Sequence, residues 1–341
     1  MNAFPRILGP SVLLVCAVLR PAAAQSYHVA HTYTLGGNGG WDYVTLDTAG
    51  HRLFIARQDR VMVVDPATGK VLAEIPGFNG AHGVAFAYQS GHGFGSSGRD
   101  SSVVMFDLKT LAVQGRTTAA LDADAILYDP ASHRVFTFNG DANSSTALDA
   151  VSGKRVGTID LGTGPEFAVS AGDGKLYVNL EEKAAVAEID AATLQVTRQW
   201  SLAPCATPTG LAIDRAHHRL FSGCRSGVMA ISDATAGKLI TTLPIGQAVD
   251  ACRFDPGTQL AFASNGDGTL TVVHEDAPDR FRVVANVPTR RGARTMELDE
   301  TTHRIFTVTA DFGPTPAATP EHPRPRPPIL PGTFALLVLE P

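Results

Sequence analysis

One phrase that recurs along the chain constrains its fold more than any other feature. An Asp, a short polar turn, His-Arg, a hydrophobic residue and Phe occur four times, as DTAGHRLF, DPASHRVF, DRAHHRLF and DETTHRIF. Three weaker copies lie between them, and the aromatic residues of the seven copies are spaced 40 to 44 residues apart, at Phe54, Phe94, Phe136, Tyr177, Phe221, Phe262 and Phe306. A period of this length indicates a repeat architecture.

Each copy contains short β-branched runs separated by turn residues, as in VMVVDPATGKVLAEI and VMAISDATAGKLITTL. Such runs predict hairpins, and four strands in about 40 to 45 residues make one propeller blade. We therefore predict an all-β, seven-bladed β-propeller over residues 26–341. The last copy lacks a fourth strand, and residues 27–35 form an orphan strand, so we expect the two to pair and close the ring.

The first 24 residues predict a secretory signal peptide. Arg6 gives a positive start, residues 7–19 are mostly apolar, and Ala22-Ala23-Ala24 offers a cleavage point. The apolar stretch is too short for a membrane span, which needs about 20 residues. We therefore expect a periplasmic or secreted protein without a membrane span, in a compartment that permits disulfides.

The charge balance limits the partners. Removing the leader removes two of the 28 basic residues and none of the 33 acidic ones, which leaves a net charge of −7. An acidic chain without a basic, aromatic-rich stripe disfavours nucleic-acid binding. We expect a monomer whose partner is a small molecule or a protein.

Several segments carry a family resemblance. The motifs GGWDYVTLD, DAILYDPASHRVFTFNG, PTGLAID and GARTMELD are similar to those of the secreted YncE-like, or YVTN-repeat, β-propeller proteins of bacteria. The resemblance covers nearly the whole mature chain and implies a seven-bladed propeller in the periplasm or outside the cell. It supplies no catalytic motif.

The first strands of the seven copies predict a polar ring. In a propeller the innermost strand of each blade begins at the mouth of the central channel. One aligned position near that beginning holds mostly ionisable residues, and we name this set the mouth ring: Asp42, His82, Asp124, Glu166, Thr209, Asp250 and Arg294. We predict that these residues bind a ligand.

Converging carboxylates repel one another, so their ionised form needs a cation, a proton or Arg294 nearby. Oxygen ligands with one imidazole suit calcium, magnesium or zinc. A divalent metal is therefore the cofactor that the pattern allows, with candidate ligands Asp42, His82, Asp124, Glu166 and Asp250. Polar groups that hold only water are the alternative.

Two further features are expected beside the mouth ring. Three residues past each aromatic anchor lies a second polar column, from which we take as ligand-binding Arg57, Asn139 and Asn265, with the adjacent Asn179 of the fourth copy. The last copy also carries an insertion at residues 310–333 with eight prolines, His322, Arg324 and Arg326. We expect this Pro-rich segment to cover part of the mouth, a disordered surface loop being the alternative.

Cys205 and Cys224 flank the inner hairpin of the fifth copy, so we predict a disulfide between them. Cys252 lies within a strand and is expected to be a buried apolar residue.

Three functions remain open. The leading hypothesis is a secreted propeller that binds a small ligand or a protein partner at the channel mouth. The second is a metal-dependent enzyme of the lactone-hydrolase or lyase type, in which His82 or a carboxylate moves a proton. The third is a structural interaction scaffold. Whether the protein is an enzyme is not decided by the sequence, because no HExxH, CxxCH or GxSxG motif is present.

Overall fold

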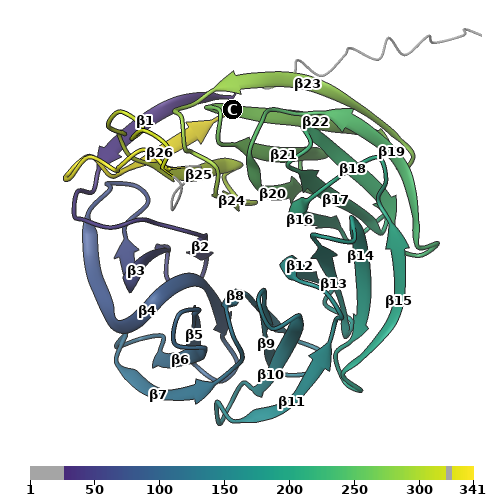
Figure 1. Cartoon of the computed structure of the whole chain (residues 1–341), viewed down its shortest axis with the longest axis horizontal. Coiled ribbons are helices and arrows are strands. Elements are labelled where there is room, and N and C mark those ends of the chain that lie inside the picture. The colour runs from purple at the N-terminus through teal and green to yellow at the C-terminus, as the bar shows by residue number, and fades with distance from the viewer. Residues whose placement is uncertain (1–26, 320–324) are drawn as a thin grey trace, which may run out of the picture.

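The computed structural model describes residues 27–319 and 325–341 as β-sheets arranged around a central axis. The predicted signal peptide, with His322 and Arg324 of the insertion, lies outside these described residues. Figure 1 shows the ring, with β2, β8, β12, β16, β20 and β24 nearest its centre. The predicted all-β propeller is confirmed. In the described part of the chain no helix is long and apolar enough to cross a membrane.

The strands are hydrogen-bonded into six sheets within the described residues. The first sheet has six strands, namely β2 (Val44–Asp47), β3 (Arg52–Val64), β4 (Val71–Ala87), β5 (His92–Ser97), β6 (Ser102–Asp107) and β7 (Val113–Thr118). The next two contain β8 (Ala123–Asp129), β9 (Arg134–Asn139), β10 (Ser144–Asp149), β11 (Arg155–Asp160), then β12 (Pro165–Ser170), β13 (Lys175–Leu180), β14 (Ala185–Asp190) and β15 (Gln195–Ser201).

The remaining three sheets also have four strands each. Two contain β16 (Pro208–Asp214), β17 (Arg219–Cys224), β18 (Val228–Asp233), β19 (Lys238–Pro244), then β20 (Val249–Asp255), β21 (Leu260–Asn265), β22 (Thr269–Ala277) and β23 (Arg280–Pro288). The last combines β24 (Met296–Asp299), β25 (Arg304–Thr309) and β26 (Ala335–Glu340) with β1 (His28–Thr34), which pairs antiparallel with β26.

The predicted number of seven blades is wrong when blades are counted as hydrogen-bonded sheets, because six are present in the described residues. The difference arises at residues 44–118, where the first two repeat copies share one sheet. There β3 and β4 run on for 13 and 17 residues, and Gln58 pairs with Ala81 across the junction between the copies. The segment between these copies is therefore bonded into the sheet instead of forming a loop.

The recurring phrase has a local structural reason. The residue before the second strand of each copy has a left-handed backbone conformation, with φ between 52° and 94°, at His51, Gly91, His133, Gly174, His218, Gln259 and His303. Gly adopts this conformation without strain, and His is among the residues that tolerate it. The seven aromatic anchors are all buried, so each copy contributes one large side chain to the hydrophobic clusters of the propeller.

Candidate functional site

Most mouth-ring positions share one backbone feature. Five of these residues lie at register shifts between the first and second strands of their copies: His82, Asp124, Glu166, Thr209 and Asp250. A β-bulge re-aims the side chain that it carries and ends regular pairing. The other two residues, Asp42 and Arg294, precede β2 and β24.

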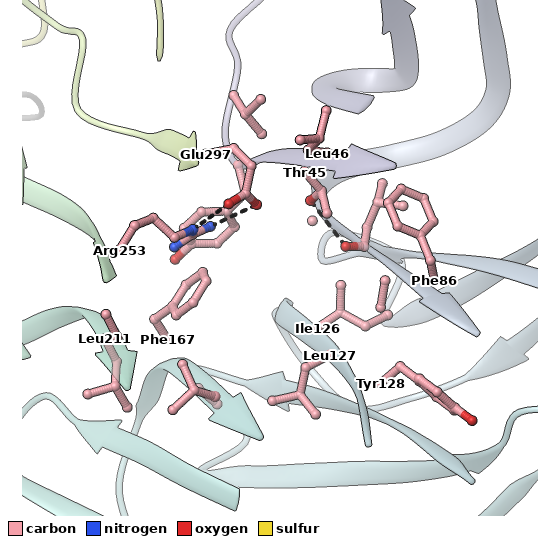
Figure 2. Close-up of a pocket in the computed structure, with 18 of the residues that line it drawn as sticks. Thr45, Leu46, Phe86, Ile126, Leu127, Tyr128, Phe167, Leu211, Arg253 and Glu297 are labelled. Atoms are coloured by element: carbon pink, nitrogen blue, oxygen red, sulfur yellow. Dashed lines mark hydrogen bonds and ion pairs between the residues drawn. The ribbon is translucent and has the colours of Figure 1, made fainter. Parts of the chain in front are cut away.

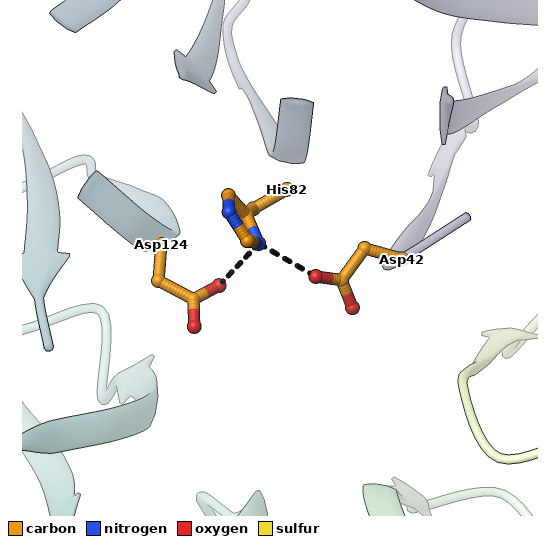
Figure 3. Close-up of side chains that lie close together, drawn as sticks. All are labelled: Asp42, His82 and Asp124. Carbon is orange, nitrogen blue, oxygen red and sulfur yellow. Dashed lines mark hydrogen bonds and ion pairs between the residues drawn. The ribbon is translucent and has the colours of Figure 1, made fainter. Parts of the chain in front are cut away.

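His82 joins two carboxylates of the mouth ring. Its Nδ1 lies 2.7 Å from Asp42 Oδ2 and 3.3 Å from Asp124 Oδ1, as Figure 3 shows. A third carboxylate, that of Asp122, lies 4.0 Å from Nε2. Burial alone would lower the pKa of His82, but the hydrogen bond to Asp42 and the surrounding negative charges outweigh it and raise the pKa to about 9. The imidazolium is therefore the form favoured at neutral pH.

Arg294 and Asp250 form the second pair of the ring, with 2.6 Å between Nε and Oδ2. Arg225 lies near the same groups, with its guanidinium 3.1 Å from Glu181, 3.7 Å from Asp250 and 3.8 Å from Glu166. Alternating charges thus extend around this side of the mouth.

The pKa values of two ring carboxyls are raised above their ordinary range. Burial, together with the charges of Asp124, Glu181 and Asp250, raises the pKa of Glu166 to about 9. Burial also raises the pKa of Asp124 to about 7, against the opposing effect of His82. A protonated carboxyl can donate a hydrogen bond, whereas a carboxylate can only accept one.

The predicted metal ligands are only partly brought together. Asp42, His82 and Asp124 each offer a ligand atom within 4.8 Å of the others, which is close enough for one ion. Glu166 and Asp250 lie outside that group and interact with Arg225 and Arg294 instead. One imidazole and two carboxylates are a donor set that suits zinc or another first-row divalent ion.

The Thr209 side chain is bonded to the main chain. Its side chain is buried, and its hydroxyl lies within 3.2 Å of the carbonyl oxygens of Gly223 and Val249. The hydroxyl therefore connects neighbouring strands.

The predicted second column is also buried. Arg57 donates to main-chain carbonyls of the segment 36–40 and lies 3.6 Å from the ring centre of Phe334. Asn179 donates to the carbonyls of Thr209 and Gly210. The side-chain amides of Asn139 and Asn265 donate hydrogen bonds to residues of their own sheets.

Sequence reasoning missed the residues one position further along the same strands. Gln58, Glu181 and Arg225 follow the second column directly, and they line the mouth cavity described below or form ion pairs at the mouth. Side chains of a strand alternate between faces, so an offset of one residue exchanges a buried column for an exposed one. The signal was present, because charged residues occupy this next position in the fourth and fifth copies.

The Pro-rich insertion lies against part of the mouth ring. A cavity of about 470 Å³, which we call the mouth cavity, is lined by ring and neighbouring residues together with the insertion, namely Gly40, Trp41, Asp42, Gln58, Gly80, Ala81, His82, Arg99, Arg294, Phe312, Arg326, Pro327 and Ile329. Phe312 and Ile329 pair through their main chains, and the ring centres of Trp41 and Phe312 are 6.1 Å apart. The described part of the insertion therefore forms one wall of the cavity.

A second cavity of about 420 Å³ lies further along the inner strands. It is lined by Tyr43 and by the apolar side chains of Leu46, Ile126, Leu127 and Phe167, of which the last four are labelled in Figure 2. Arg253 pairs with Glu297 at 2.7 Å and lies 5.0 Å from the ring centre of Phe167.

The phenol of Tyr43 connects this second cavity with the mouth ring. Burial and the four ring carboxylates raise its pKa well above the ordinary value. Tyr43 and Phe167 pack edge to face at 5.0 Å, and both rings line the second cavity.

The cysteine predictions agree with the structure. Cys205 and Cys224 form a disulfide with a Cα–Cα distance of 5.8 Å, which ties the segment before β16 to the end of β17. Cys252 is free and buried, and burial raises the pKa of its thiol to about 12.

Comparisons with known proteins support the propeller fold. No family model and no curated protein matches the chain. Among solved structures, a chain of hydrazine synthase from Kuenenia stuttgartiensis is 16% identical, with a TM-score of 0.70, and the match covers 79% of this chain and 92% of that one. The WD40 repeats of RRP9 are 10% identical, with a TM-score of 0.71, and the match covers 94% and 99%.

U3-55K is also 10% identical, with a TM-score of 0.71 and coverage of 93% and 99%. At these identities the likeness concerns the fold alone.

Proposed function

We propose that this protein binds a small organic anion in the mouth cavity. The observation that carries the proposal is the composition of the cavity, in which the ring residues Asp42, His82 and Arg294 face side chains of the Pro-rich insertion. A concave site of several hundred Å³ with a few converging polar groups is the usual form of a small-molecule site.

The charge of the mouth cavity favours an anion. Arg99, Arg326, Arg294 and His82 contribute positive groups to the lining; Arg294 already pairs with Asp250, and His82 with Asp42 and Asp124. Arg99 and Arg326 are exposed, so their charges are not buried in the protein. Arginine binds carboxylate and phosphate groups through paired N–H donors.

The remaining lining residues favour a ligand with an organic body. Trp41, Phe312 and Ile329 offer apolar surface beside the charged groups. Gln58 adds an amide, which can donate to a hydroxyl group or accept from it. A hydroxylated carboxylate or a sugar phosphate therefore matches the cavity better than an inorganic ion does.

The proposal includes the location and the finer family assignment. We place the protein in the periplasm or outside the cell, as a monomeric YncE-like propeller with a cleaved leader at residues 1–24. The Cys205–Cys224 disulfide supports an oxidising compartment. We further propose that β1 and β26 close the ring, which is supported by their antiparallel pairing.

A metal-dependent hydrolase or lyase is a second candidate. The Asp42, His82 and Asp124 group favours it, because three ligand atoms lie within 4.8 Å of one another. A divalent ion there would polarise a carbonyl of a bound substrate, and the protein would supply His82 and two carboxylates to hold the ion.

A binding experiment separates these functions. Citrate, gluconate and glucose 6-phosphate are titrated into the purified chain by calorimetry and thermal shift, with glucose and spermidine as neutral and cationic counterparts. We expect at least one anion to bind, and Arg294→Gln to weaken it by more than about tenfold, since a charge-assisted bond contributes about 1.5–3 kcal/mol. Arg155→Gln, on the exposed strand β11, is the matched control.

The proposal fails if none of these anions binds, or if Arg294→Gln and an Asp124→Asn/Glu166→Gln variant both bind as the wild type does. Binding that requires an added divalent ion and disappears in His82→Gln would favour the metal-dependent candidate. Elemental analysis of the same samples supplies the metal content.

A further inference from the structure

A second group of metal-ligand side chains lies outside the mouth, between two neighbouring sheets. We call Asp214, His217 and Glu275 the inter-sheet cluster. Asp214 ends β16, His217 lies in the turn that follows it, and Glu275 lies on β22 of the next sheet. One ligand atom from each residue lies within 4.8 Å of the other two.

The geometry of the inter-sheet cluster centres on one imidazole nitrogen. His217 Nδ1 lies 2.6 Å from Asp214 Oδ2 and 3.1 Å from Glu275 Oε1. Both carboxylate side chains are only 1% exposed, whereas the imidazole is 38% exposed. The imidazole thus connects two buried carboxylates with solvent, from which an ion and a water ligand can enter.

The buried carboxylate of Glu275 points to a bound ligand. Both of its carboxylate oxygens are buried; among the described residues Oε1 faces only His217 Nδ1, at 3.1 Å, and Oε2 has no hydrogen-bond partner. Asp214 Oδ2 likewise faces only His217 Nδ1, and within the described chain the ion pairs of both carboxylates are with His217 alone. Buried charges are normally paired, hydrogen-bonded or bound to a metal.

The nearby cation Arg219 is already occupied. Its guanidinium lies 2.9 Å from Asp279 and 3.3 Å from Asp233. Among the described residues Arg219 forms no ion pair with Asp214 or Glu275. The protein itself therefore leaves this pair of carboxylates incompletely neutralised.

The repeat shows that both unusual residues are departures from a common pattern. The position of His217 is taken in the other three strong copies by small turn residues, Gly50, Ser132 and Thr302. The main-chain N–H of Glu275 donates to the carbonyl oxygen of Gln259, the left-handed residue of its copy. In other copies the residue that makes this same bond is apolar and buried: Leu108, Ala150, Ala191 and Ala234. The two departures contact each other across the sheets.

We infer that Asp214, His217 and Glu275 bind a first-row divalent cation, for which zinc is the natural probe. One imidazole nitrogen and two carboxylate oxygens form a three-ligand set that zinc accepts, with water in the fourth position. Zinc ligand atoms are about 3.3 Å apart in a tetrahedron with bonds of about 2.0 Å, so the His217–Asp214 distance must open by less than about 1 Å. The bound ion would link adjacent sheets of the propeller.

Zinc binding to the chelator-treated full chain tests this inference. Zinc is titrated by calorimetry, and cobalt absorption reports the ligand geometry. We expect a binding event that is weakened more than about 100-fold in Glu275→Ala and in His217→Ser, because loss of a ligand should exceed the 10–100-fold cost of outer-shell changes. Both variants restore residue types that other copies carry, so they should fold.

Two matched controls separate this cluster from other imidazoles. His303 pairs with Asp255 at 2.7 Å, and no third ligand lies nearby in the part of the chain that the structure describes, so His303→Asn should bind zinc like the wild type. Because Asp42, His82 and Asp124 are themselves a candidate ion site, the titrations are repeated in a His82→Gln background, which isolates the event at the inter-sheet cluster. The inference is overturned if the wild type binds no zinc, or if Glu275→Ala and His217→Ser bind it as tightly as the wild type.

Discussion

At the scale of single residues, Arg57 shows how a charged side chain in a polar column can be structural. Its side chain is fully buried, and four main-chain carbonyls, those of Gly36, Asn38, Gly39 and Gly40, accept its hydrogen bonds. Burial, together with the charge of Arg60, lowers the pKa of the guanidinium to about 10. Arg57 thus fixes the segment that leads into the mouth cavity.

Arg57→Met is expected to destabilise the protein by about 3 kcal/mol, because the four carbonyls lose their donor and the stacking on Phe334 is lost. Urea unfolding followed by fluorescence measures the change. Arg99→Met at the exposed mouth is the control and should alter stability by less than about 0.5 kcal/mol. Equal stability of the two variants would show that the buried bonds contribute little.

At the scale of elements, turns and one covalent link hold the strands in place. The third strand of several copies ends in an Asp whose carboxylate accepts main-chain N–H bonds of the following turn, as at Asp107, Asp190 and Asp233. Such Asx turns reverse the chain between the two outer strands. In the fifth copy the Cys205–Cys224 disulfide adds a link between the segment before β16 and the end of β17.

Replacing both Cys205 and Cys224 by Ala is expected to lower the free energy of unfolding by about 3 kcal/mol, since the disulfide closes a loop with a sequence separation of 19. Denaturant unfolding of the wild type with and without reductant gives the same quantity independently. Cys252→Ala serves as the control, because that thiol is free and buried. A double variant as stable as this control would contradict the prediction.

At the scale of the whole molecule, groups at the mouth and at the turns respond to pH in opposite ways. The pKa of Glu166 is raised from 4.5 to about 9 in the folded protein, and that of His82 from 6.5 to about 9. The folded state therefore binds more protons than the unfolded state between about pH 5 and 9, and its stability must fall as the pH rises through this window.

The turn carboxylates act at the other end of the pH scale. The pKa values of the turn aspartates are lowered by hydrogen bonds, as at Asp107 and Asp149, so their contribution is lost as the pH falls below about 4.

We expect the melting temperature to be highest near about pH 5 and to fall towards pH 9. Glu166→Gln should flatten this fall, with a relative gain of about 1 to 3 kcal/mol at pH 8 compared with pH 5, because the amide cannot ionise. Thermal unfolding across the pH range measures both curves. A Glu166→Gln curve parallel to the wild-type curve would show that this carboxyl does not account for the pH dependence.

Much of the fold and part of the site could be predicted from the sequence. The all-β propeller followed from the spacing of the aromatic anchors, and the Cys205–Cys224 disulfide from their places beside one hairpin. The side-by-side arrangement of Asp42, His82 and Asp124 followed from the equivalence of their repeat positions. These features depend on local pattern and period, which the amino-acid sequence alone determines.

Tertiary structure decided the features that depend on pairing across the chain. Two repeat copies share one sheet because Gln58 pairs with Ala81. The second column is buried because its strand positions face inward, and the residues directly after it, Glu181 and Arg225, form an ion pair at the mouth instead. The meeting of His217 with Glu275 is also a contact between sheets, which no local pattern reveals. A repeat defines which positions are equivalent, but strand register and packing define what each side chain faces.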